Sequence, residues 1–273
     1  MPVRETFTQA SAVHERHRDG DRASFSADLH PGWGVGGRPN GGYLLAVLGR
    51  AVAATGRHPD VVAVSAHFLR PPATGPADVE LEVLHEGRSV STVRASLRQE
   101  GRTCVEALVT TGDLDRTAPV WRGEIEPPAV AAMEDCTRLV AVTDAFEVPL
   151  MDQLDLRLDP GSMGWTVGAP TGRGELLGRI ALLDEPAFDP LSLLVAVDAF
   201  PPAPFDVEVT GWVPTIQLSA YVRARPADGP VVVRHRAQVI AQGRVDETTT
   251  VWDRNGAVVA QGTQLAGIRL APR

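Results

Sequence analysis

The sequence predicts an α+β fold made of two copies of one unit, in which a single helix packs against an antiparallel sheet. Three observations predict it: short motifs that recur along the chain, one apolar helical segment in each half, and alternating strand-forming residues after each helix. The length of 273 residues fits this duplication, because one domain typically has about 150 residues.

Short motifs recur in the same order in both halves of the chain. The matching pairs are residues 29–32 (LHPG) with 158–161 (LDPG), 65–68 (SAHF) with 219–222 (SAYV), and 75–76 (GP) with 229–230 (GP). The preserved order indicates an internal repeat. It predicts an N-terminal repeat over residues 1–115, a linker over 116–137 and a C-terminal repeat over 138–273.

The N-terminal repeat is predicted to begin with a strand and a helix. Residues 23–29 alternate between apolar and polar types, as a half-buried strand does. Asn40 can cap the apolar segment 41–54, which predicts one helix. Residues 14–17 (HERH) are interpreted as a solvated helical turn. Four strands are predicted after the helix, over residues 61–69, 77–86, 89–99 and 103–111.

The C-terminal repeat is predicted to have the same order of elements. A strand over residues 151–158 comes first, and Asp189 and Pro190 suit the start of a helix that runs to Phe200. Prolines at the next two positions end that helix, since proline lacks the amide hydrogen that a helix interior needs. Four strands follow, over residues 215–224, 231–240, 244–253 and 257–270.

Composition and charge exclude several classes of protein. The chain is 44% hydrophobic and has a formal net charge of -8, which argues against nucleic acid as a partner. No apolar run reaches the ~18 residues of a membrane span, and the first residues lack the apolar core of a signal peptide. Cys104 and Cys136 have no disulfide-framework or metal-binding spacing. We therefore expect a cytoplasmic protein that needs no metal or other cofactor.

Several motifs are similar to those of one enzyme family. Residues 40–46 (NGGYLLA), 64–71 (VSAHFLRP) and 86–89 (EGRS), followed by Gln99, resemble the first half of TesB-like (thioesterase II) acyl-CoA thioesterases. Members of that family are double hotdogs, in which each of two repeats wraps a curved antiparallel sheet around a long helix. The implied fold agrees with the repeat found in the sequence itself.

The resemblance also implies three catalytic residues, all in the second repeat. They are an acid on the helix, a hydroxyl that opens the next strand and an amide on the last strand; the matching positions hold Asp198, Thr215 and Gln264. Gln264 lies five residues before Arg269, as in the family, whereas Gln261 lacks that spacing and is expected on the opposite strand face. The implied reaction is hydrolysis of an acyl thioester by an oriented water.

Asp198 also carries information without the resemblance. Leu191, Leu194, Val195 and Asp198 follow the i, i+3, i+4, i+7 pattern, so the carboxylate is expected on the apolar stripe of the helix. It lies near the helix C-terminus, where the helix dipole disfavours an anion. Such a carboxylate needs polar partners or a function, unless the last turn frays and exposes it.

Thr215 and Gln264 are less informative on their own. Alternation places Thr215 on one strand face with Gln217 and Ser219, opposite the apolar face. Threonine is common in strands, so its match to the family position is what favours catalysis. Gln264 shares its face with small and apolar residues such as Ala266, and a glutamine there needs a polar partner.

The start of the first helix is a candidate substrate-binding site. Asn40, Gly41 and Gly42 begin that helix, and backbone amides at a helix N-terminus bind developing negative charge. Glycines also let a substrate approach the backbone closely. The expected substrate is an acyl-CoA or an acyl thioester of a carrier protein, with the acyl chain between helix and sheet.

Two other functions stay open. His30, Gly34 and Pro39 fit the His-x3-Gly-x4-Pro spacing of double-hotdog dehydratases, which would pair His30 with Asp198 on a 3-hydroxyacyl thioester. The second alternative is a non-catalytic acyl-binding protein of the same fold. By analogy with the family we expect a homodimer. Alignment of the two helices from their caps puts Gly49 opposite Asp198, which predicts one active site per chain.

Overall fold

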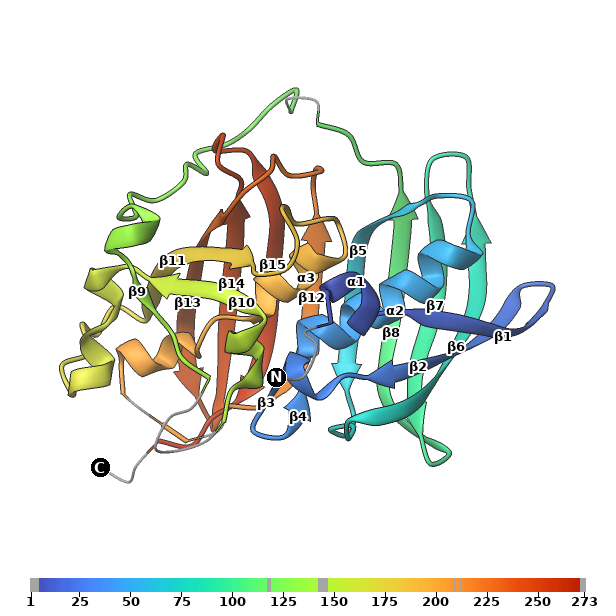
Figure 1. Ribbon diagram of the computed structural model, residues 1–273, viewed down its shortest axis with the longest axis horizontal. Coiled ribbons are helices and arrows are strands. Elements are labelled where there is room, and N and C mark those ends of the chain that lie inside the picture. The colour runs from blue at the N-terminus through green and yellow to red at the C-terminus, as the bar shows by residue number, and fades with distance from the viewer. Residues whose placement is uncertain (1–4, 117–118, 142–146, 209, 212, 271–273) are drawn as a thin grey trace.

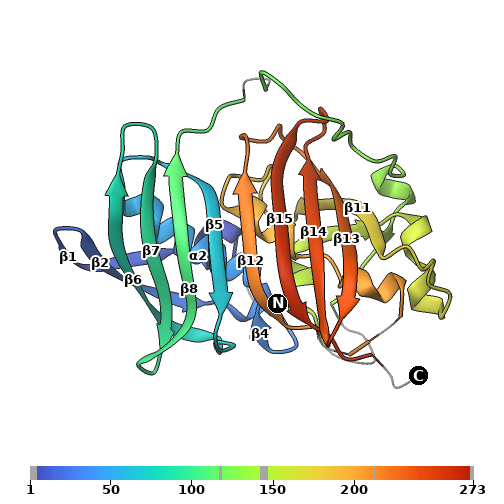
Figure 2. The ribbon, with the colours of Figure 1, turned by 180° about the vertical axis from the view of Figure 1, so that it is seen from behind.

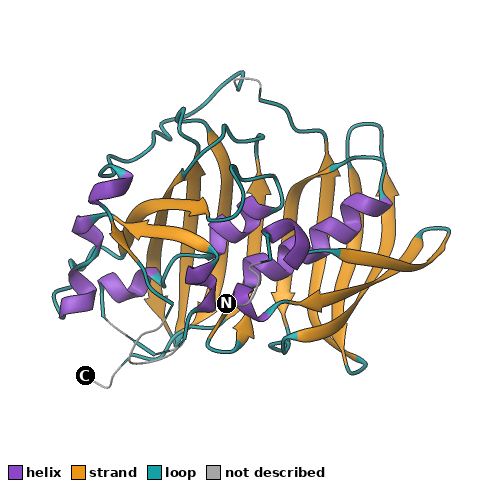
Figure 3. Ribbon diagram, viewed as in Figure 1, coloured by secondary structure: helices purple, strands orange, loops and turns teal. Residues whose placement is uncertain are grey.

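Two helices lie side by side on one face of a large antiparallel sheet in the computed structural model (Figure 1). The structure describes residues 5–116, 119–141, 147–208, 210–211 and 213–270. The two ends of the sheet curl toward the helices, while the opposite face carries no helix among the described residues (Figure 2). Colouring by secondary structure shows the helices gathered on the inner side of this curved sheet (Figure 3).

The N-terminal half holds the longer helix, α2, which spans Gly41–Thr55. Asn40 caps it as predicted, because its Oδ1 accepts a hydrogen bond from the Tyr43 amide at 3.0 Å. Around it lie α1 (Phe7–Ala10), β1 (Val13–Asp19), β2 (Arg22–Leu29), β3 (Gly34–Val35), β4 (Arg38–Pro39), β5 (Asp60–Phe68), β6 (Gly75–Glu86), β7 (Ser91–Gln99) and β8 (Arg102–Gly112). The prediction of a helical turn at residues 14–17 is wrong. A tight turn at Gly20, where φ is +55°, folds this segment back as a strand along β2.

The C-terminal half holds α3, which is shorter than predicted and spans Ser192–Asp198. Asp189 still precedes this helix as a capping residue, because its Oδ1 accepts a hydrogen bond from the Ser192 amide at 2.6 Å. Residues 190–191 between them form a turn and not the predicted start of the helix. The strands are β9 (Thr137–Arg138), β10 (Leu154–Leu158), β11 (Glu175–Leu182), β12 (Thr215–Val222), β13 (Val231–Ala241), β14 (Arg244–Trp252) and β15 (Val258–Gly267). The sequence did not predict β11, and the strand expected from residue 151 begins only after a 3-10 turn.

The two halves join in the middle of one sheet. Its strand order is β1-β2-β6-β7-β8-β5-β12-β15-β14-β13-β11-β10-β9. At the junction Ser65 of β5 pairs with Ser219 of β12, the two serines of the recurring motif, and the flanking pairs are symmetric about them. The internal repeat is therefore structural, and the predicted double hotdog is confirmed. The chain between the halves crosses above the sheet in Figure 1, and Thr117 and Ala118 of the expected linker lie outside the described residues.

The core lies between the sheet and the two helices. α2 packs against α3 and against the strands of its own half, and α3 packs against β12, β14 and β15. Cys104 and Cys136 are both buried and are not joined by a disulfide. Within the described ranges, no helix is long and apolar enough to cross a bilayer. The same ranges contain no cluster of three or more metal-ligating side chains.

Candidate active site

Asp198, the last residue of α3, faces the first turn of α2. Its Oδ2 accepts hydrogen bonds from the Gly42 amide at 2.8 Å and from Asn40 Nδ2 at 2.9 Å. The same Asn40 Nδ2 donates to the Asp198 carbonyl oxygen at 3.0 Å. The carboxylate thus lies at the N-terminus of a 15-residue helix, whose dipole favours an anion, although the end of its own helix disfavours one. α2 supplies the polar partners that the sequence pattern required.

The environment of Asp198 makes its carboxylate a stronger base than usual. Burial raises the pKa of Asp198 to about 6. The Gly42 amide, the imidazole of His235 and the Asn40 side chain oppose this rise, and the charge of Glu247 adds to it. The residue as a whole is half-buried. A pKa near neutrality is the property that general-base catalysis needs.

Thr215 and Gln264 meet on neighbouring strands beneath α3. Thr215 Oγ1 donates a hydrogen bond to Gln264 Oε1 at 3.0 Å, and Gln264 Nε2 donates to Glu247 Oε2 at 2.6 Å. The helix comes close to β15 because Gly262 has no side chain, and Val197 of α3 fills that space. The helix α3, which ends at Asp198, therefore packs on the two strands that carry Thr215 and Gln264.

The strand face predicted for Thr215 is wrong. Thr215 and Gln217 pair with consecutive residues of β15, Ala266 and Leu265, so Ile216 is the extra residue of a β-bulge. A bulge reverses the alternation of side chains along a strand. It turns Thr215 toward the helices and the Gln264 amide, whereas Gln217 points to the other face.

Gln261 and His30, the alternative candidates for catalytic residues, make other contacts. Gln261 accepts a hydrogen bond from Arg223 Nε at 3.1 Å on the outer strand face, as expected for it. His30 Nδ1 accepts from the Gly32 amide at 3.0 Å and caps a 3-10 turn, and its Nε2 lies 3.9 Å from a Glu5 oxygen. Among the described residues, no hydrogen bond joins His30 to Asp198.

We expect the His30→Ala variant to keep thioester-hydrolysing turnover within about threefold of wild type, because the ring supports a turn and loss of one such hydrogen bond costs about 1 kcal/mol of stability. Steady-state thiol release and a melting curve measure the two quantities. A loss of turnover as large as that of an Asp198 variant would favour the dehydratase-type pairing instead.

The first turn of α2 has a structural reason for its glycines. A Cβ on Gly42 would overlap the Leu194 carbonyl oxygen and lie 2.9 Å from the Val195 Cα, so Gly42 allows α2 and α3 to approach each other. This reason differs from the expected one, close approach of a substrate. A Cβ on Gly41 would lie 2.8 Å from Asp198 Oδ2 and 3.1 Å from the Phe68 ring. Gly41 therefore borders the carboxylate directly.

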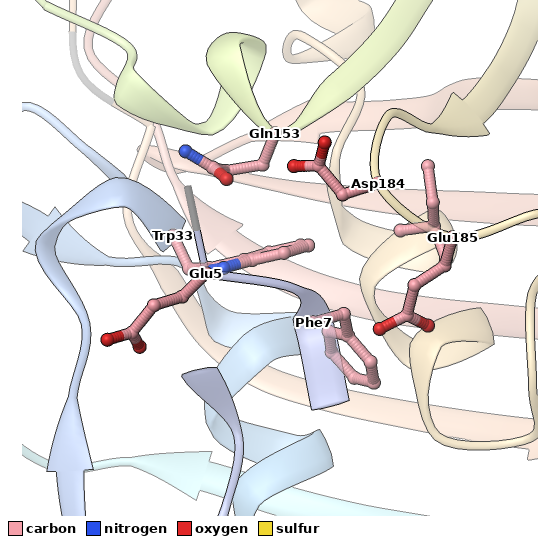
Figure 4. Close-up of a pocket in the computed structure, with 7 residues that line it drawn as sticks. Glu5, Phe7, Trp33, Gln153, Asp184 and Glu185 are labelled. Carbon is pink, nitrogen blue, oxygen red and sulfur yellow. The ribbon is translucent and has the colours of Figure 1, made fainter. Parts of the chain in front are cut away.

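A depression near the N-terminus is separate from these residues. Figure 4 shows its lining side chains; with Leu182 they are Glu5, Phe7, Trp33, Gln153, Asp184 and Glu185. Three of them are acidic and repel the phosphates of coenzyme A. None of the predicted site residues lines this depression.

Two family models match most of the chain. The acyl-CoA thioesterase N-terminal domain matches residues 29–112, and the acyl-CoA thioesterase C-terminal domain matches residues 133–268. The chain belongs to the TesB-like acyl-CoA thioesterase family. All three candidate catalytic residues of this thioesterase-family chain lie in the part that matches the C-terminal domain.

The chain is also similar to other proteins along its whole length. An uncharacterized protein of Mycobacterium tuberculosis is 32% identical over 285 aligned residues, which cover 95% of this chain and 97% of that protein. A solved structure described as a candidate thioesterase II from Thermobifida fusca YX is 33% identical, with a TM-score of 0.87 over 97% of both chains. A hot dog fold protein of unknown function from Alicyclobacillus acidocaldarius is 21% identical, with a TM-score of 0.83 over 99% of this chain and 100% of that chain, and shows likeness of fold. The family supports acyl thioester hydrolysis as the general chemistry.

Proposed function

We propose that this thioesterase-family protein hydrolyses acyl-CoA thioesters to a free acid and the CoA thiol, with Asp198 as the general base. The observation that carries the proposal is the arrangement of the Asp198 carboxylate. Two donors hold its Oδ2, while its Oδ1 has no donor among the described residues and is free to accept a proton from water. The hydrogen-bonded pair of Thr215 and Gln264 lies on the strands against which α3 packs.

The reaction needs one oriented water and no covalent acyl-enzyme. The water oxygen attacks the thioester carbonyl carbon while Asp198 takes one of its protons, which gives a tetrahedral intermediate. The carbon–sulfur bond then breaks, and the thiolate leaves with the electron pair. Thr215 holds the water in place by a hydrogen bond, and Gln264 holds the Thr215 hydroxyl. A general base of this kind contributes on the order of 10²–10⁴-fold, and positioning contributes the rest.

The first turn of α2 is the proposed site for the thioester carbonyl. The Gly42 amide is already bonded to Asp198, so the Gly41 amide is the better donor toward the developing oxyanion. Gly41 has no side chain beside the carboxylate and sits at the positive end of the helix dipole. Asn40 acts as a support, because it caps this turn and binds Asp198 at once.

A panel of acyl thioesters tests the proposed function. Short, medium and long acyl-CoAs and an acyl thioester on a carrier protein are each incubated with the wild-type protein, and thiol release is followed with a thiol reagent. We expect release from at least one acyl-CoA class. A folded wild-type protein that releases no thiol from any of them contradicts the proposal, and release from the carrier-bound thioester alone contradicts the assignment to coenzyme A.

The pH dependence should report Asp198. Its pKa of about 6 lies above the ordinary value of 3.8, and the base is active only when ionised. We therefore expect kcat/KM to fall as the pH drops through about 6 and to level off above it, since this parameter reports the free enzyme. A profile that stays flat from pH 7 down to pH 4.5, with the protein still folded, contradicts this role.

A further inference from the structure

A chain of buried polar groups lies behind Gln264. Glu247 on β14 is 1% exposed, and His235 on β13 is 4% exposed. Glu247 Oε2 accepts from Gln264 Nε2 at 2.6 Å, and its Oε1 accepts from the Ala203 amide at 2.8 Å and from His235 Nε2 at 3.0 Å. The other ring nitrogen of His235 lies 2.8 Å from Thr249 Oγ1. Neither Glu247 nor His235 was predicted from the sequence.

The N-terminal repeat shows what the fold itself requires at these positions. The strand pairings align the repeats residue by residue, so that Thr215, His235, Glu247, Thr249 and Gln264 correspond to Val61, Leu81, Val93, Ala95 and Val109. All five residues of the N-terminal repeat are apolar and at most 4% exposed. Apolar side chains are therefore enough to build a hotdog repeat at these positions. The polar residues occur only in the repeat that holds the candidate catalytic residues.

The charge of Glu247 determines the direction of each hydrogen bond. Burial acts to raise the pKa of Glu247, but His235 and the donors Ala203 and Gln264 hold it below its ordinary value, so the carboxylate is ionised at neutral pH. An ionised carboxylate can only accept hydrogen bonds. Gln264 must therefore turn its Nε2 toward Glu247 and its Oε1 toward Thr215.

This orientation fixes what Thr215 can do. The hydroxyl has a single hydrogen and donates it to Gln264 Oε1 at 3.0 Å, so toward Asp198 its oxygen can only accept. A water that donates one O–H to Thr215 and the other to Asp198 keeps a lone pair on its oxygen for the carbonyl carbon. If Thr215 donated to the water instead, it would occupy such a lone pair.

We propose that Glu247, supported by His235, is a positioning residue that locks the Gln264 amide in one orientation and so makes Thr215 an acceptor for the attacking water. This inference rests on the proposed function. Glu247 acts through Gln264 and Thr215 and does not contact the substrate.

The Glu247→Gln variant should reverse the chain of hydrogen bonds. The new amide keeps its oxygen toward the two donors, His235 and the Ala203 amide, and turns its NH2 group toward Gln264. Because two NH2 groups cannot bond to each other, Gln264 flips and presents its own NH2 group to Thr215. We expect kcat to fall on the order of 10- to 100-fold, with KM changed by less than about threefold because substrate binding is not touched.

A double variant separates positioning from structural support. In Glu247→Gln/Gln264→Glu the carboxylate moves to position 264, where it accepts from the new amide at position 247 and from Thr215, so the original direction returns. We expect kcat to recover by about tenfold over the single variant. Asp246→Asn is the matched control, one residue before Glu247. The Asp246 carboxylate accepts a hydrogen bond from the Val239 amide at 2.8 Å, and the Asn side chain can accept it too, so turnover should stay unchanged.

Thiol release by wild type, the two Glu247 variants and Asp246→Asn is the deciding comparison. An active wild type with unchanged kcat in Glu247→Gln, or no recovery in the double variant, overturns the positioning role and leaves the proposed function standing. An inactive wild type overturns both. If Glu247→Gln does not fold, His235→Leu/Glu247→Val/Thr249→Ala, which copies the N-terminal repeat, takes its place. It should fold and lose kcat, and full kcat in this variant overturns the inference.

Discussion

Replacing Asp198 with Asn is expected to lower kcat/KM by on the order of 10²–10⁴-fold, the contribution of a general base. The Asn oxygen can still accept from the Gly42 amide and Asn40, so the junction between α2 and α3 keeps its hydrogen bonds. The NH2 group then takes the place of Oδ1 and cannot accept a proton from water. Thiol release from the best acyl-CoA measures the loss.

Stability provides the control for this variant. The pKa of Asp198 in the folded protein, about 6, lies above the ordinary 3.8, so above pH 6 ionisation of this carboxyl group opposes folding. Asn carries no charge, and at pH 8 we expect a melting temperature no lower than that of wild type. Turnover within threefold of wild type in a folded Asp198→Asn protein would refute Asp198 as the base.

The Gly42→Ala variant is expected to have the largest effect on stability. The added Cβ would overlap the Leu194 carbonyl oxygen, and backbone atoms of α3 cannot move aside as a side chain can. Overpacking of this kind costs about 1–3 kcal/mol. The separation of α2 from α3 also weakens the Gly42 hydrogen bond to Asp198, so turnover should fall with stability. Thermal unfolding and thiol release measure both effects.

Gly41→Ala is the matched control, one residue away on the same helix turn. The three atoms nearest to its Cβ would be side-chain atoms of Asp198 and Phe68, and these can shift. We therefore expect turnover to fall with a smaller change in melting temperature. The helix-packing explanation is wrong if Gly42→Ala melts at the wild-type temperature, or if the two variants lose the same stability.

The architecture could be predicted because the repeat shows in short recurring motifs and in the alternation of apolar residues. The recurring serine motif marks the strands that pair at the centre of the sheet, Ser65 with Ser219. Other elements were missed or differ from their prediction, and three of them show why. Residues 14–17 are polar and become strand through the turn at Gly20, β11 was not recognised, and α3 is shortened by the turn that Asp189 makes with Ser192. Each depends on pairing or capping that composition alone does not reveal.

The candidate site was predictable in part. Asp198 stands out as an acid on an apolar stripe, but its partners come from α2, far away in the chain. The face of Thr215 was missed because the bulge at Ile216 leaves no mark in the alternation. Glu247 and Thr249 could have been found, since they lie between Val245 and Val251 on the same inward face of β14. Polar residues on an apolar strand face were the signal.

A single-turnover reaction in 18O-labelled water, with protein in excess over acyl-CoA, tests whether the oxygen of water enters the released acid directly. We expect that each released acid carries one 18O atom, that one CoA thiol appears per acid, and that the peptide containing Asp198 gains no label. This is the labelling expected when water attacks the thioester carbonyl carbon with the carboxylate as its base. Label in the Asp198 peptide, or unlabelled acid, would show that the carboxylate forms a covalent acyl-enzyme and does not act as a base on water.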